Sequence, residues 1–281
     1  MMKRPGTPGS RLLILILPLL LLSCRKHELY LIPAPQKARV VVSFENFDGA
    51  GPLQTDALIY ATSLGNRYQV NDLQYFISEL VFHAPGGKDL MVPDDDSIHY
   101  IDLHIDSTLE WKINGLQLPA GQYDSVSFIF GLDQNANRSN RFPNPPERDM
   151  FWPDILGGGY HYMKMNLKWK NDTMTELMPF MFHLGIGQIY EGTTEDPDSI
   201  IGFVQNYFRV TLPASSFLLK EGTDCHLTIR MNVDRWFDGE NAFDFGAYPM
   251  GIMQNEQGMH LACLNGRKVF TCKVELPQSG K

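Results

Sequence analysis

Histidine and methionine side chains on two extended segments are the groups of this sequence best suited to bind a metal. Alternation along His161–Trp169 places His161 on a face that also carries methionines, and alternation along Met178–Ile186 places His183 beside Met181. Imidazole is the commonest metal ligand, and thioether sulfur favours Cu(I). A site built from two or three of these groups would suit copper. A simpler interpretation stays open, in which the methionines fill gaps in a core and the histidines are hydrogen-bonded core residues.

Motifs of the common enzyme classes are absent from the sequence. It contains no G-x-S-x-G, H-E-x-x-H, phosphate-binding loop, dinucleotide fingerprint or haem-attachment C-x-x-C-H. The net charge is −8 and the sequence has no basic cluster, which argues against nucleic acid because phosphate binding needs concentrated Lys and Arg. We therefore expect a protein that is not an enzyme and does not bind nucleic acid.

The N-terminus has the three parts of an export signal. A basic stretch precedes the apolar run Leu12–Leu22, which is shorter than the roughly 20 residues that cross a bilayer. The residues Leu21–Cys24 look like a lipobox, in which Cys24 receives the lipid. We expect a lipoprotein signal peptide over residues 1–23 and a lipid-anchored tether over residues 24–37 that attaches the protein to a membrane. The alternative is an ordinary cleaved signal that happens to end in cysteine.

Three cysteines remain beyond the signal, and none has the C-x-x-C spacing of a structural zinc site. An oxidising compartment allows one disulfide, most simply Cys263–Cys272 across a short loop, which leaves Cys225 free.

Short β-type segments recur through the rest of the chain and predict an all-β fold. They are rich in Tyr, Phe, Val and Ile and are bounded by Gly, Pro, Asn and Asp. The clearest are Arg39–Phe47, Leu73–His83, Ser97–Ile105, Tyr123–Leu132, His161–Trp169, Met178–Ile186, Tyr207–Leu212 and His226–Val233. We expect one antiparallel β-sandwich or jelly-roll domain over residues 38–281. Its long loops, Asp133–Gly159 and Asp234–Gly258, are where a site is expected. Ala214–Lys220 could form one helical turn, and Gly246–Leu264 could hold a short helix.

Several segments together resemble the MbnP family, the methanobactin-associated periplasmic copper-binding proteins, whose relatives are common as lipoproteins in Bacteroidetes-type bacteria. The segments are Tyr75–Leu80, Leu118–Tyr123, Phe128–Asp133, Asp149–Trp152, Gly159–Lys164 and Phe182–Gly185. Met-Phe-Trp, ending at Trp152, and Phe-His-Leu-Gly, ending at Gly185, are the most specific parts. Where many relatives carry Glu-Gly after the Met-Lys or Leu-Lys strand, this chain has Met165 and Asn166.

The resemblance implies a β-sandwich-like domain with a copper site that uses histidines and kynurenine, an oxidised tryptophan. It also implies a dihaem partner enzyme, similar to the MauG and cytochrome c peroxidase group, that makes the modification. Carried over by motif, His161 and His183 are the best ligand candidates, and Trp152 is the candidate for the modified tryptophan. His83 and His260 are candidates for a third ligand.

These expectations combine into a non-catalytic, copper-binding lipoprotein that sequesters or delivers copper outside the cytoplasm. Its location would be the outer membrane or periplasm of a Gram-negative bacterium. The alternative is a metal-free module of the cell surface that binds a ligand or protein through the aromatic residues Trp152, Tyr160, Tyr162 and Trp236.

Overall fold

The computed structural model describes residues 2, 38–192, 196–248 and 250–277. The predicted signal peptide, Cys24 and the tether therefore lie outside the described residues, except for Met2. Within those ranges, no helix is both long and apolar enough to cross a membrane.

The first of two large sheets has the strand order β17-β16-β1-β2, with β7 also paired to β1. Its strands are β1 (Ala38–Asp48), β2 (Gly51–Pro52), β7 (Glu110–Leu118), β16 (Cys225–Asn232) and β17 (Phe270–Glu275). The pairing of β1 with β16 is parallel, and the other pairings of this sheet are antiparallel. Inward and outward residues alternate clearly along β1 and β7, as expected for a sheet with one buried face.

The second sheet has the order β11-β10-β4-β9-β14, with β3, β5 and β6 also paired to β4. Its strands are β3 (Tyr60–Ala61), β4 (Arg67–His83), β5 (Leu90–Met91), β6 (Ile98–Asp102), β9 (Ser125–Phe130), β10 (Met163–Lys170), β11 (Met178–Leu184) and β14 (Phe208–Thr211). All of its pairings are antiparallel. The long strand β4 is the centre of the sheet, and β10 holds β11 against it.

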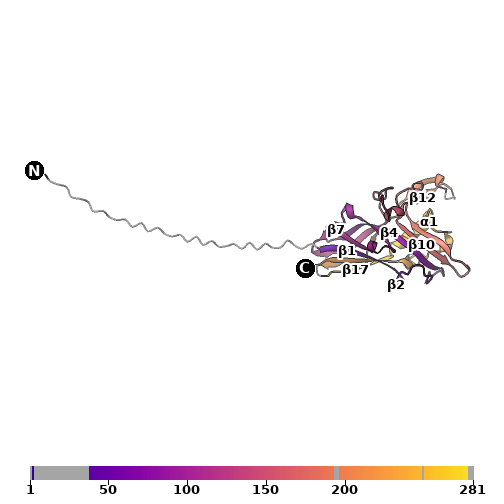
Figure 1. The fold of residues 1–281 in the computed structure, drawn as a ribbon, viewed down its shortest axis with the longest axis horizontal. Helices are drawn as coiled ribbons and strands as arrows, with labels where there is room; N and C mark the ends of the chain where they lie inside the picture. Colours follow the sequence, from indigo (N-terminus) through magenta and orange to yellow (C-terminus); the bar gives the residue numbers. More distant parts are fainter. Residues whose placement is uncertain (1, 3–37, 193–195, 249, 278–281) are drawn as a thin grey trace. The chain divides into compact units, whose positions relative to one another are not determined.

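Smaller elements complete the domain. Strand β8 (Gly121–Tyr123) pairs with β15 (Phe217–Leu219), and β12 (Gly187–Tyr190) pairs with β13 (Ile200–Val204). The helix α1 (Glu256–Gly266) lies beside β12 (Figure 1). The 3-10 helices are η1 (Asp94–Asp96), η2 (Asp106–Leu109), η3 (Glu147–Met150), η4 (Asp154–Leu156), η5 (Pro197–Ser199), η6 (Val233–Trp236) and η7 (Phe245–Ala247).

Aromatic side chains join the two sheets across a common core. The ring of Phe128 in β9 meets that of Phe270 in β17 edge to face, with 5.2 Å between centroids. The Tyr75 hydroxyl of β4 donates to Asn46 Oδ1 of β1 at 3.3 Å. Such edge-to-face pairs add about 0.5–1.5 kcal/mol beyond the burial of their surface. The predicted all-β sandwich is thereby confirmed, with the parallel β1–β16 pair as a departure from a purely antiparallel design.

All eight segments predicted as strands contain one, but the predicted helical turn at Ala214–Lys220 is wrong. Ala214 has a φ of 53°, a left-handed conformation in which an α-helix does not start, and Phe217–Leu219 forms β15. The helix expected within Gly246–Leu264 is present, and it begins only at Glu256.

The disulfide expected between Cys263 and Cys272 is not formed, and all three described cysteines are free thiols. Cys263 lies in α1 and its Sγ donates to the Asn206 carbonyl oxygen, whereas Cys272 lies in β17 and donates to that of Pro213. Burial raises the pKa of the Cys263 thiol to about 12, so it stays protonated at neutral pH.

Candidate metal site

A closed loop before β10 positions His161. Phe151 and Tyr160 form an antiparallel bridge, and the His161 backbone N–H donates to the Met150 carbonyl oxygen at 2.7 Å. The imidazole Nδ1 lies 2.9 Å from the same oxygen. A carbonyl oxygen can only accept, so Nδ1 carries the proton and Nε2 carries the lone pair. His161 was expected to begin the strand, but β10 begins at Met163 and the histidine lies just before it.

Strand β11 positions His183, which lies opposite Lys164 of β10. Phe180 and Phe182 are buried and Met181 is exposed. The His183 side chain contacts Asn166, the register partner of Met181, so it lies on the face that alternation predicted. Its Nε2 lies 2.9 Å from Asn166 Oδ1, an acceptor, which places the proton on Nε2 and the lone pair on Nδ1.

The rings of His161 and His183, called the histidine pair below, meet edge to face. Their ring centroids are 5.1 Å apart, with an interplanar angle of 84°. Each residue is only 6% exposed. His161 Nε2 and His183 Nδ1 are buried and have no hydrogen-bond partner among the described residues. These are the two nitrogens that carry lone pairs, and buried polar atoms without a partner are rare enough to need a cause.

Burial keeps both imidazoles neutral. It lowers the pKa of His161 to about 4, where the backbone groups of Met150 and Phe151 oppose the effect and the Lys164 ammonium adds to it. It lowers the pKa of His183 to about 3, with smaller contributions from His161 and Lys164. Neutral imidazole is the form that binds a metal, so the pair needs no proton release to do so at neutral pH.

Trp152 packs against the histidine pair. It is fully buried, and its ring meets that of His161 edge to face with 4.6 Å between centroids. Its indole Nε1 donates to the Leu156 carbonyl oxygen at 3.1 Å. The indole also rests on Gly185, where a Cβ atom would lie 2.6 Å from Trp152 Cε3. The glycine of Phe-His-Leu-Gly is therefore the residue that admits the tryptophan of Met-Phe-Trp.

Three consecutive glycines let the chain turn back between Trp152 and His161. Gly157, Gly158 and Gly159 have φ values of 110°, 69° and 82°, a region that residues with a Cβ rarely adopt. A Cβ on Gly159 would also strike the Asn137 side chain, which accepts the Tyr160 backbone N–H. The turn brings Trp152 of Met-Phe-Trp back against His161 of the segment Gly159–Lys164.

Comparison with known proteins identifies the family of the chain. The profile of the MbnP family matches residues 37–254. The chain belongs to the MbnP family. A solved structure, MbnP from Methylosinus trichosporium, is similar at 13% sequence identity over 74% of this chain and 80% of that chain, with a TM-score of 0.47. No curated protein is similar enough to match. The family match extends well beyond Gly185, where the resemblance recognised in the sequence ends.

His83 and His260, the candidates for a third ligand in this MbnP-family protein, do not join the histidine pair. The described ranges contain no group of three or more His, Cys, Asp or Glu side chains arranged for a metal. His83 lies eight positions along β4 from Tyr75, the partner of Met163, which is about 26 Å in an extended strand. Its nitrogens contact Asp89 Oδ2 at 2.9 Å and Ser127 Oγ at 2.7 Å. His260 is exposed on α1.

The aromatic residues of the alternative, metal-free function are core residues. Trp152, Tyr162 and Trp236 are 0% exposed and Tyr160 is 1% exposed. A surface that binds sugars or proteins through these four side chains is therefore not present.

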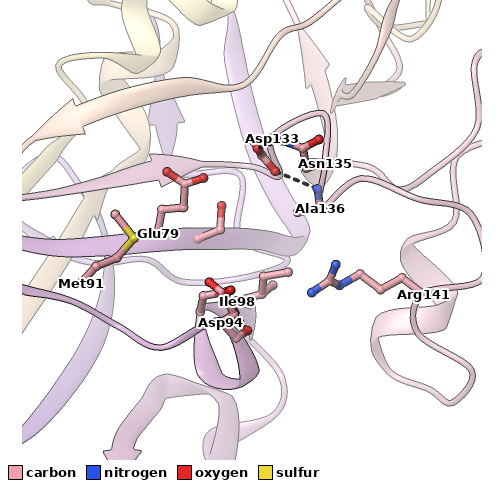
Figure 2. A pocket seen from close by; sticks show the side chains of 10 residues that line it. Glu79, Met91, Asp94, Ile98, Asp133, Asn135, Ala136 and Arg141 are labelled. Carbon is pink, nitrogen blue, oxygen red and sulfur yellow. Dashed lines mark hydrogen bonds between the residues drawn. The ribbon is translucent and has the colours of Figure 1, made fainter. Parts of the chain in front are cut away.

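A separate cavity of about 390 Å³ contains neither histidine of the pair. Figure 2 shows Glu79 and Arg141 on opposite sides of it, with Asp133 accepting the Ala136 backbone N–H at 2.7 Å. The Glu79 carboxylate is paired with Arg209 at 2.6 Å. The first part of the loop after β9 thus lines this cavity, and the last part carries His161 of the histidine pair.

Proposed function

We propose that this MbnP-family protein binds copper through His161 and His183 and sequesters or delivers it outside the cytoplasm, without catalysis. One observation carries the proposal. Two buried imidazoles lie edge to face, and the nitrogen left without a partner on each ring is the one that carries the lone pair. A metal bonded to both nitrogens at about 2 Å holds the ring centroids no more than about 6 Å apart, and the observed separation lies within that limit.

The type of ligand favours copper over the hard cations. Ca²⁺ and Mg²⁺ take oxygen ligands, usually carboxylates, whereas the donors here are two neutral nitrogens. Met181 lies on the same strand face as His183, two positions away, and offers a thioether. Imidazole with thioether suits copper, and thioether in particular suits Cu(I). When bound, the copper ion would be held for storage or transfer, and the protein's own residues would exclude water from it.

We also propose Trp152 as the tryptophan that a dihaem partner oxidises. Its edge contact with His161 supports this assignment, because a product of that ring would lie next to the ligand. Opening an indole to kynurenine needs an external oxidant, which the family resemblance assigns to the partner enzyme. Intact-mass and peptide mass spectrometry on protein from its native host would find an unaltered Trp152 if the assignment is wrong.

Membrane attachment through Cys24 remains part of the proposal, with the tether holding the domain away from the lipid. Cys24→Ala should release the protein into the soluble fraction after export. A protein that still sediments with membranes in this variant, and carries no lipid by mass spectrometry, would contradict the anchor.

Metal analysis tests the copper site directly. The full chain is produced in a host grown with added copper, purified from membranes in detergent, and analysed by plasma mass spectrometry. We expect about one copper per chain, lost in the double variant His161→Ala/His183→Ala and kept in the matched control His83→Ala/His260→Ala. Circular dichroism establishes that each variant is folded. Wild type without copper, or copper that survives in the first double variant, would refute the assignment.

A further inference from the structure

The Asn166 amide lies between the histidine pair and an acidic side chain of the neighbouring strand. Asn166 of β10 is the register partner of Asp72 in β4, and its Nδ2 donates to Asp72 Oδ2 at 3.1 Å. On the other side, its Oδ1 accepts the proton of His183 Nε2 at 2.9 Å. Asp72 is thus linked to His183 through the Asn166 amide. Its second oxygen, Oδ1, lies 3.5 Å from His104 Nε2.

The carboxylate decides which way the amide points. A carboxylate only accepts hydrogen bonds, so the amide must turn its NH₂ group toward Asp72 and its oxygen toward His183. An oxygen that faces His183 Nε2 requires a proton there, which leaves the lone pair on Nδ1, the atom without a partner. A reversed amide would donate to Nε2 and move the proton onto Nδ1.

We propose that Asp72, acting through Asn166, is a positioning residue that fixes the tautomer of His183 and so sets the copper affinity of the pair. The inference rests on the proposed copper site for its second half only. Hydrogen-bond partners of this kind, behind a metal ligand, are typically worth about 10–100-fold in metal affinity. Asp72 achieves this from a position where its own side chain is 45% exposed, so replacing it leaves the core intact.

The test uses Asp72→Ala in the full chain, with Asp89→Ala as the matched control. Asp89 is similarly exposed, at 43%, and contacts a histidine outside the pair, His83. Nitrogen-15 NMR of the metal-free protein reports the tautomer of His183, and competition with a Cu(I) chelator reports affinity. In Asp72→Ala we expect population of the Nδ1–H tautomer and a fall in Cu(I) affinity of about 10–100-fold. Asp89→Ala should match wild type in both.

A second substitution separates positioning from general damage to the fold. The carboxylate that Asn166→Asp introduces cannot donate, so Asp72→Ala/Asn166→Asp should restore the Nε2–H tautomer and the wild-type affinity. An Asp72→Ala protein that keeps both the Nε2–H tautomer and its affinity overturns the inference, as does a double variant that restores neither. If wild type binds no copper, the proposed function fails, and the NMR comparison alone decides whether Asp72 controls the tautomer.

Discussion

Copper affinity should be almost independent of pH in mildly acidic solution, because burial has removed proton competition at the histidine pair. Two exposed imidazoles with a pKa near 6.5 would each lose about tenfold in metal affinity at pH 5.5, or about 100-fold together. With the pKa of His161 lowered to about 4 and that of His183 to about 3, about 3% or less of either ring is protonated at pH 5.5. The copper affinity of the pair should therefore fall by less than about twofold between pH 7.5 and 5.5.

The assay is competition for Cu(I) against a colorimetric chelator, such as bicinchoninate, under anaerobic and reducing conditions. Measurements at pH 7.5, 6.5 and 5.5 are corrected for the proton affinity of the chelator itself. A synthetic peptide with two exposed histidines serves as the control, since its imidazoles keep an ordinary pKa. The peptide should weaken steeply over this range while the protein does not.

A parallel loss of affinity in protein and peptide would refute the reasoning. It would mean that the ligands titrate near pH 6.5, and hence either that the buried pair does not bind the copper or that water reaches it. Nitrogen-15 NMR of the metal-free protein separates these outcomes, because it follows the protonation of each ring directly.

Three further results are expected from the same structure. Gly185→Ala forces a methyl group against the Trp152 ring and should cost about 1–3 kcal/mol in denaturant unfolding; Gly202→Ala, whose Cβ would meet only Ile189 at 3.5 Å, is the control. Burial raises the pKa of Asp48 to about 6. The contribution of Asp48 to stability is thus present below pH 3.8 and lost as the pH rises through 6. Asp48→Asn should therefore stabilise the protein at pH 7 and not at pH 4. The gain should be up to about 2 kcal/mol, a figure reduced for the partial exposure of the side chain. The histidine pair has the opposite pH dependence, because its pKa values are lowered: its contribution to the free energy of unfolding is present above pH 6.5 and falls toward pH 4 by about 3 kcal/mol per ring. Replacing both rings with Phe should flatten this pH dependence of stability.

Much of the fold could be predicted because β-strands have a period of two residues, which the sequence displays. In β11, alternation alone placed His183 opposite Phe180 and Phe182. The same reasoning misplaced His161 because a loop hydrogen bond to Met150, and not strand geometry, fixes that residue. Periodicity predicts side-chain direction only within regular elements, so it does not predict the direction of His161, which precedes the strand.

The contacts that define the site depend on register, which a single sequence does not encode in any local pattern. Asn166 and Asp72 are far apart in the chain and become partners only through the pairing of β10 with β4. The distance of His83 from the pair follows from the same register. The predicted disulfide failed for a related reason, because a short separation in sequence does not make two thiols face each other when a helix and a strand carry them.

The other histidines of the domain show why the pair is exceptional. His99 is stacked between Phe44 and Trp111 with its Nε2 against the Thr108 carbonyl oxygen, and His83 has a partner on both nitrogens. Each unpartnered nitrogen of the pair costs about 1–3 kcal/mol of folding free energy. A ligand present at 100 times its dissociation constant returns about 2.7 kcal/mol. The cost of leaving two lone pairs unpaired in the core is thus of the size that a bound metal would offset.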